Sequence, residues 1–171
     1  LGITDPFEPQ AFPVRLWDVF GQAGHPVRAT VEGMGSLLLS RLLDLNETQT
    51  GILAIVFKLA QEKNWLLIDL KDLQSLLKEV YEHSSEYSAQ YGNITKQSVG
   101  AIQRSLLVLE EEGADQFFGE PALDLNDFMQ LDASGRGYIN ILSATKLFHS
   151  PKLYSTFLIW MLSRLFETLP E

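Results

Sequence analysis

The stretch from Ser36 to Lys63 constrains the fold of this chain most, because its apolar residues recur with the period of a helix. The apolar positions are Leu38, Leu39, Leu42, Leu43, Leu45, Ile52, Ile55, Val56 and Leu59. Their spacing of three and four residues places them on the buried side of a helix. The pattern breaks near Asp44, where Asn46 is placed to cap a second helix and Gln49 follows it as in a capping box. We therefore expect two helices joined by a short turn.

Several later segments also predict helices. Asp69 can cap a helix with the apolar stripe Leu73, Leu76, Leu77 and Val80, and residues 93–112 form another with Val99, Ile102, Leu106 and Leu109, ended by Gly113. Residues 84–92 fit either a helix tail ending at Gly92 or a mobile loop, and residues 124–129 fit one short helix. A final helix begins at Pro151 and is apolar on nearly every side, so it needs cover from a neighbour or from another copy of the chain.

Strand patterns are few and lie near the two ends. Residues 14–20 and 27–31 alternate around a loop with Gly21 and Gly24, and residues 138–142 are rich in β-branched and aromatic side chains. The predicted fold class is mainly α (α+β), a helical bundle of about six helices with two or three short strands near the ends. We divide the chain into an N-terminal arm and β-hairpin (1–35), a helical bundle (36–130), and a turn, strand and apolar helix (131–171).

Composition limits the function. The chain has 171 residues, 46% of them hydrophobic, which is a globular composition. A formal charge of -9 argues against nucleic-acid binding over a broad face, and the helix pair at 36–63 offers few cations for reading DNA. The absence of cysteine excludes disulfides and thiolate metal sites. No apolar run approaches the roughly 20 residues of a membrane span, so we expect no membrane contact. The lack of cysteine favours an intracellular chain, and we expect a cytoplasmic location.

No motif in the chain supports catalysis or metal binding. Residues 132–139 align with a calcium-binding loop, but Arg136 stands at a ligand position and Ser143 where a bidentate glutamate belongs. A tight turn into a strand is the better interpretation. The three histidines lie outside any hydrolase motif, and there is no phosphate-binding loop with its lysine. The glycines Gly33 and Gly35 indicate a turn. We assign no catalytic, cofactor-binding or metal-binding residue.

Several blocks of the chain resemble a known family. They are Trp17-Asp18-Val19-Phe20-Gly21, Gly24-His25-Pro26-Val27-Arg28-Ala29-Thr30-Val31, Leu38 to Glu47, Tyr91-Gly92-Asn93-Ile94, Ser98 to Arg104, Phe117-Phe118-Gly119-Glu120-Pro121 and Ile139 to Ala144. In this order they resemble bacterial HerA-like ATPases of the HerA/FtsK P-loop superfamily. The resemblance covers nearly the whole chain.

The resemblance implies a RecA-like core that couples ATP hydrolysis to movement on DNA, with ATP and magnesium as its cofactors and ring-shaped assembly. In such proteins the Walker A and Walker B motifs lie outside the matching region. We therefore expect an excised, non-catalytic piece, with Leu1 in place of an initiator methionine, that contacts the rest of the ATPase or self-associates. It should neither bind nor hydrolyse ATP by itself, and it would meet DNA only through the parent.

Two arginines are weak candidates for a site in the intact parent. Arg28 and Arg104 lie in matching blocks and could act from the periphery of a nucleotide site, although an ordinary surface or helix-pairing role is more frequent for such residues. A different class of function also fits the sequence, namely a self-contained helical binding or regulatory domain unrelated to ATP.

Overall fold

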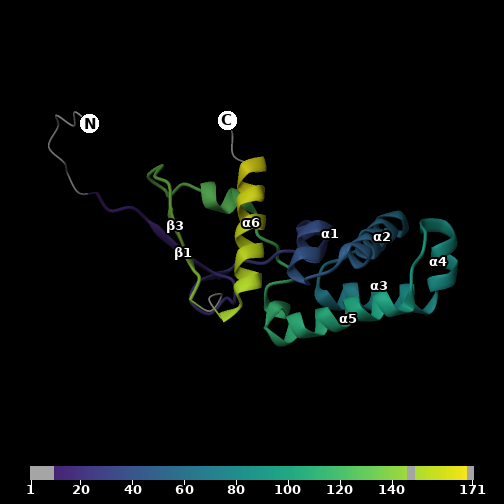
Figure 1. The fold of residues 1–171 in the computed structure, drawn as a ribbon. Helices are drawn as coiled ribbons and strands as arrows, with labels where there is room; N and C mark the ends of the chain where they lie inside the picture. Colours follow the sequence, from purple (N-terminus) through teal and green to yellow (C-terminus); the bar gives the residue numbers. More distant parts are fainter. Residues whose placement is uncertain (1–9, 146–148, 169–171) are drawn as a thin grey trace, which may run out of the picture.

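The computed structural model describes residues 10–145 and 149–168. The elements are β1 (Val14–Asp18), β2 (His25–Pro26), α1 (Val31–Leu42), α2 (Glu47–Lys63), α3 (Leu70–Glu82), α4 (Ser84–Tyr91), α5 (Lys96–Glu111), the 3-10 helices η1 (Ala114–Gln116) and η2 (Leu125–Met129), β3 (Ile139–Ser143) and α6 (Pro151–Thr168). The sheet and α6 form one end of the molecule, and α2 to α5 form the other, with α1 between them (Figure 1). The mainly helical α+β class is confirmed.

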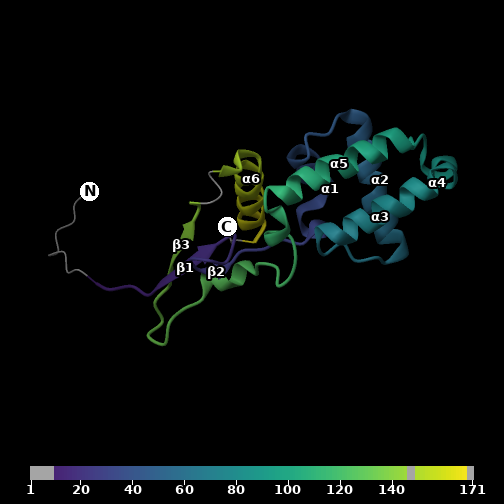
Figure 2. The same cartoon turned by 90° about the horizontal axis from the view of Figure 1, so that it is seen from below.

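The sheet has three parallel strands in the order β2-β1-β3. Val14 pairs with Ile139 and Leu16 with Ile141, so the first and last parts of the described chain meet in one sheet. Figure 2, the view from below, shows these strands together beside α6. The expected arm lies largely in residues 1–9, outside the described residues.

The predicted β-hairpin is wrong, because β1 and β2 run parallel. The carboxylate of Asp18 accepts hydrogen bonds from the amides of Phe20, Gln22 and Ala23, which curls the loop back on itself. At Gly24 the loop crosses β1 so closely that a Cβ would lie 2.5 Å from the carbonyl of Leu16. Only glycine fits this crossing, which carries the chain to the start of a parallel strand.

The expected second strand at 27–31 also differs from the structure. Its backbone leaves the sheet, and the amide of Ala29 donates to the carbonyl of Phe117 while the amide of Gly119 donates to the carbonyl of Ala29. Thr30 then caps α1 by accepting from the amide of Gly33. The backbone of Ala29 is therefore paired with the distant 117–119 segment in an isolated bridge, and the Thr30 side chain with the start of a helix, instead of a neighbouring strand.

The predicted helix pair is confirmed. Asn46 accepts from the amide of Gln49, and the Gln49 side chain accepts from the amide of Asn46, which is the expected capping box. The first helix begins earlier than Ser36, but it is interrupted at Gly35, whose φ is 79°. The turn expected at these glycines thus falls within α1.

The stripes predicted for α3 and α5 are buried and face the bundle core. The buried members are Leu73, Leu76, Leu77 and Val80 on α3, and Val99, Ile102, Leu106 and Leu109 on α5. Asp69 caps α3 as expected, and Gly113 ends α5 with a φ of 87°. Residues 84–91 form a separate helix, α4, rather than a loop. Ile55 on α2 is only half-buried, so its expected full burial is corrected.

Aromatic packing joins α6 to the rest of the core. The rings of Phe157 and Trp160 meet Phe117 edge-on, with centroids 5.8 and 5.9 Å apart. The indole of Trp160 donates to the carbonyl of Gly33 on α1. One side of this apolar helix is therefore covered. None of the helices in the described ranges combines the length and hydropathy needed to cross a membrane.

Candidate functional site

The candidate site is an apolar surface on one face of the sheet. It consists of Val14, Leu16, Ile139 and Ile141, which we call the apolar sheet face. Side chains alternate between the faces of a strand, and the parallel register sets these four residues in two adjacent pairs. Each is 48–52% exposed. Four large aliphatic side chains of a parallel sheet are thus exposed to solvent.

The opposite face of the same strands is largely covered by other side chains of the chain. The indole of Trp17 donates to the Asn140 side chain at 2.8 Å, and its ring meets Phe128 edge-on with centroids 4.7 Å apart. Arg15 lies 4.4 Å from the centre of the Tyr138 ring and donates to the carbonyl of Asp127. The exposure of the apolar sheet face therefore does not come from a generally loose sheet.

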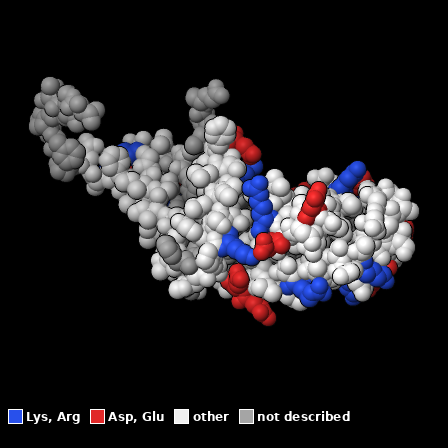
Figure 3. All heavy atoms as spheres, in the orientation of Figure 1, with Lys and Arg blue, Asp and Glu red and all other residues white. Residues whose placement is uncertain are grey.

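A second apolar surface lies on α6. Ile159, Leu162 and Phe166 follow one another at helical spacing, and we call them the α6 stripe. Phe166 is 90% exposed. On the face drawn in Figure 3 the end with the sheet has few charged side chains, whereas Lys, Arg, Asp and Glu gather over the base of α6 and the helical bundle. The expectation that α6 needs further cover agrees with this exposure.

Arg28 is held by the loop it touches. Its Nη1 donates to the carbonyl of Glu120 at 2.8 Å, and its own carbonyl accepts from the amide of Leu123. Its Nε is buried and finds no acceptor among the residues that the structure describes. These contacts give Arg28 a role in fixing the 117–123 loop, and a role in a nucleotide site stays a prediction.

Arg104 lies on α5, in a different part of the molecule from Arg28. It is exposed, and a Cβ added at Gly100 would lie 3.6 Å from its Nη1, so the guanidinium folds back over its own helix. It takes part in none of the ion pairs between described residues. The structure does not bring the two arginines together, and a role for Arg104 in the parent also stays a prediction.

The loop that resembles a calcium site is a tight turn, as expected. The carboxylate of Asp132 accepts from the amides of Ser134 and Arg136 and forms an ion pair with the Arg136 guanidinium at 2.9 Å. The hydrogen bond from the Arg136 amide, aided by its side chain, lowers the pKa of Asp132. The Arg136 guanidinium thus stands at the position where a calcium-binding loop has an oxygen ligand.

One other group could hold a metal ion. Glu79, Glu82 and His83 have ligand atoms within 4.8 Å of one another at the end of α3, the one such group in the described part of the chain. Two of its members are exposed, and Glu79 already accepts from Tyr87. An exposed cluster on a single helical turn does not by itself establish a metal site.

Sequence reasoning did not find the apolar sheet face. The alternating signals at residues 14–20 and 138–142 predicted strands, but they did not reveal that the two strands pair with each other. Comparison with curated proteins and with solved structures gave no significant match for either. Residues 2–171 match the family described as Helicase HerA-like C-terminal. The blocks that resemble HerA-like ATPases and this match over nearly the whole length agree, and the chain belongs to the HerA-like C-terminal family.

Proposed function

We propose that this chain is a non-catalytic part of a HerA-like, helicase-like ATPase and contacts the rest of that ATPase through the apolar sheet face. The observation that carries the proposal is the half-exposure of Val14, Leu16, Ile139 and Ile141 on a parallel sheet. Parallel sheets occur almost only where both faces are covered. Membership of the HerA-like C-terminal family supports the rest of a HerA-like ATPase as the partner that covers this face.

Burial of the apolar sheet face would contribute part of the free energy of such a contact. Complete burial of one large aliphatic side chain contributes about 1.5–3 kcal/mol, and about half of that remains to be gained at each of these four positions. Their burial would contribute roughly 3–6 kcal/mol before the cost of association. The α6 stripe adds apolar area at the same end of the molecule (Figure 1).

The chemistry of ATP hydrolysis belongs to other residues in this proposal. A phosphate site needs several backbone amides and a lysine aimed at the phosphates, and acidic and hydroxyl groups on magnesium. No block of this sequence matches such a loop. ATP, magnesium and DNA therefore act through the rest of the ATPase, and the chain alone is expected to leave ATP unbound.

The intact ATPase that contains these residues provides the test. Leu16→Asp combined with Ile141→Asp should prevent assembly and abolish ATP hydrolysis, because two carboxylates would be buried in the contact without partners. The isolated variant chain should keep its helical circular dichroism, because both side chains are half-exposed. Its melting temperature should fall only modestly, through repulsion between two carboxylates on paired strands.

Leu107→Asp with Val108→Asp is the matched control, since these α5 side chains are similarly exposed at 54% and 56%. The control should assemble and hydrolyse ATP normally. Full activity of the sheet-face variant would overturn the proposal and favour a self-contained helical binding or regulatory domain. Loss of activity in both double variants would show that the ATPase is sensitive to added charge in general. The contact could then no longer be assigned to the apolar sheet face.

A further inference from the structure

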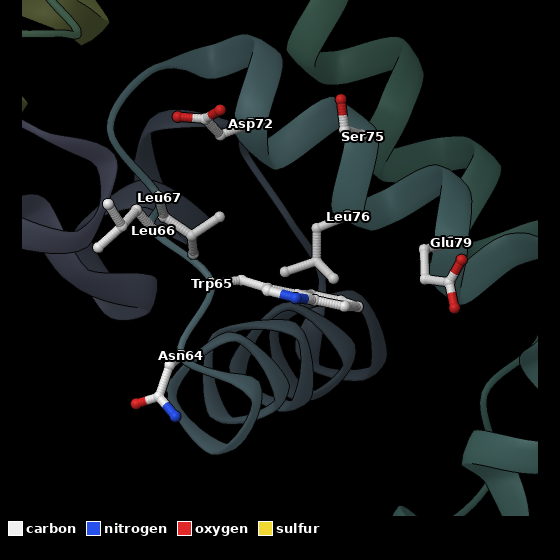
Figure 4. Close-up of a pocket in the computed structure, with 8 residues that line it drawn as sticks. All are labelled: Asn64, Trp65, Leu66, Leu67, Asp72, Ser75, Leu76 and Glu79. Atoms are coloured by element: carbon white, nitrogen blue, oxygen red, sulfur yellow. The ribbon is translucent and has the colours of Figure 1, made fainter.

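A groove of about 480 Å³ lies between α3 and the link that joins α2 to α3. Trp65, Leu66, Leu67 and Leu76 form its apolar surface, and Asp72 and Glu79 lie on α3 to either side of Leu76 (Figure 4). Leu66 is 69% exposed and Trp65 is 42% exposed. The two carboxylate residues are two helical turns apart, about 10 Å along the axis.

The walls of the groove are held in place by contacts of their own. The ammonium of Lys63 lies 4.7 Å from the centre of the Trp65 ring and donates to the hydroxyl of Tyr87 at 2.9 Å. The Tyr87 hydroxyl donates in turn to Glu79 at 3.0 Å. The hydrogen bond with Tyr87, together with the charges of Glu79 and Glu86, raises the pKa of Lys63, so this side chain stays charged beside the ring.

The link is fixed at its other end as well. The carbonyls of Leu67 and Ile68 accept from the amides of Glu32 and Val31 at the start of α1. The Asp72 carboxylate accepts from the amides of Ile68 and Asp69. The groove therefore exists before any ligand arrives, which reduces the entropy lost on binding.

We propose that this groove binds an amphipathic helix of a partner protein, with leucine-like side chains against Trp65 and Leu66 and a Lys or Arg facing each of Asp72 and Glu79. A helix laid along α3 presents side chains at i, i+3 or i+4, and i+7, which matches the two-turn separation of the carboxylates. A basic helix is favoured over a second copy of this chain, because each copy carries a net charge of -9.

The groove is formed by elements other than the strands of the apolar sheet face. The inference therefore goes beyond the proposed function, and the two can fail separately.

The test uses the full chain labelled with ¹⁵N and a synthetic alanine-based helical peptide. The peptide carries leucines at i, i+3 or i+4, and i+7, and lysines two turns apart beside them. Saturable chemical-shift changes should appear at residues 64–67 and along α3. A twin peptide with glutamates in place of the lysines should bind at least about tenfold more weakly.

Two variants locate the contact. Leu66→Ala should weaken binding of the lysine peptide at least about fivefold, whereas Leu107→Ala, an equally simple truncation on α5, should leave it unchanged. Ser75→Lys adds a cation at the rim of the groove, away from the Asp69–Asp72 cap of α3 and from the hydrogen bonds of Tyr87. It should weaken binding of the lysine peptide and strengthen binding of the glutamate twin. Because all three positions are exposed, the fold is retained.

Three outcomes would overturn the proposal. The first is equal binding of the two peptides, or no saturable binding. The second is unchanged affinity in the Leu66 variant, or shift changes confined to other surfaces. The third is chemical-shift changes at groove residues that appear without peptide as the protein concentration rises, which would show that a second copy of the chain occupies the groove.

Discussion

At the scale of single residues, two carboxylates organise loops by accepting backbone amides. Asp18, which is 5% exposed, gathers the loop after β1, and Asp132 gathers the turn before β3. Several backbone N–H groups point at each carboxylate, and at Asp132 these hydrogen bonds lower the pKa of the side chain. These two residues therefore fix the shape of the chain on either side of the sheet.

The pKa of Asp132 should respond only in part to loss of the Arg136 charge. In Arg136→Gln the backbone amides still donate to the carboxylate, so the pKa should rise yet stay below its ordinary value of 3.8. Because the folded pKa is lowered, the contribution to stability is present above pH 3.8 and is lost as the pH falls through the folded value. An NMR titration of the Asp132 carboxyl carbon measures this pKa. A return to 3.8 in the variant would contradict the leading role of the amides.

At the scale of elements, α5 is the helix around which the bundle packs. It contacts both α2 and α3, and its buried side is apolar while Leu107 and Val108 face outward. Its ends follow local chemistry, since Thr95 accepts from the amide of Ser98 at the start and Gly113 takes a positive φ at the end. The helix is thus specified locally and stabilised by burial of one side.

Two neighbouring leucines of α5 should differ sharply on truncation. Leu106 is fully buried, so Leu106→Ala should lower the free energy of unfolding by about 2–5 kcal/mol through lost burial and a cavity. Leu107→Ala is the same truncation on the same helix, but at an exposed site. It should lower the free energy of unfolding by less than about 1 kcal/mol. Ile55→Ala should fall between them, because Ile55 is half-buried. Urea unfolding measures all three, and equal losses at the two leucines would show that the buried side of α5 is wrongly assigned.

At the scale of the whole molecule, the two ends differ in how completely they cover their apolar residues. The bundle of α2 to α5 buries its stripes within itself, although Trp65, Leu66, Leu107 and Val108 stay exposed. The end with the sheet and α6, labelled in Figure 1, exposes both the apolar sheet face and the α6 stripe. Exposed apolar patches of this kind mark interaction surfaces or drive self-association. Contacts with other proteins are therefore expected mainly at the sheet end, besides the groove on α3.

The isolated chain should self-associate through the α6 stripe. Phe166→Asp should reduce association in sedimentation velocity experiments while changing the free energy of unfolding by less than about 0.5 kcal/mol, because Phe166 is 90% exposed. Thr168→Asp adds the same charge at an exposed position nearby without removing apolar area, and should have a smaller effect. Equal effects of the two variants would assign the change to charge alone.

The sequence by itself determined where most of the helices lie and several of their ends. Apolar periodicity identified the sides of α3 and α5 that are buried, and Asn46, Asp69 and Gly113 marked boundaries, because caps and helical faces depend on residues within one or two turns. The blocks that resemble HerA-like ATPases led to the family for the same reason, since they can be read directly along the chain.

Only the tertiary structure decided how the strands pair and which surfaces stay open. The parallel course of β1 and β2 depends on the close crossing at Gly24, and the apolar sheet face exists because β1 meets a strand more than a hundred residues away. The groove likewise depends on α1, α2 and α3 fixing one link. Local patterns carry no information about such distant contacts, because the same alternating strand can be buried, paired or exposed according to what packs against it.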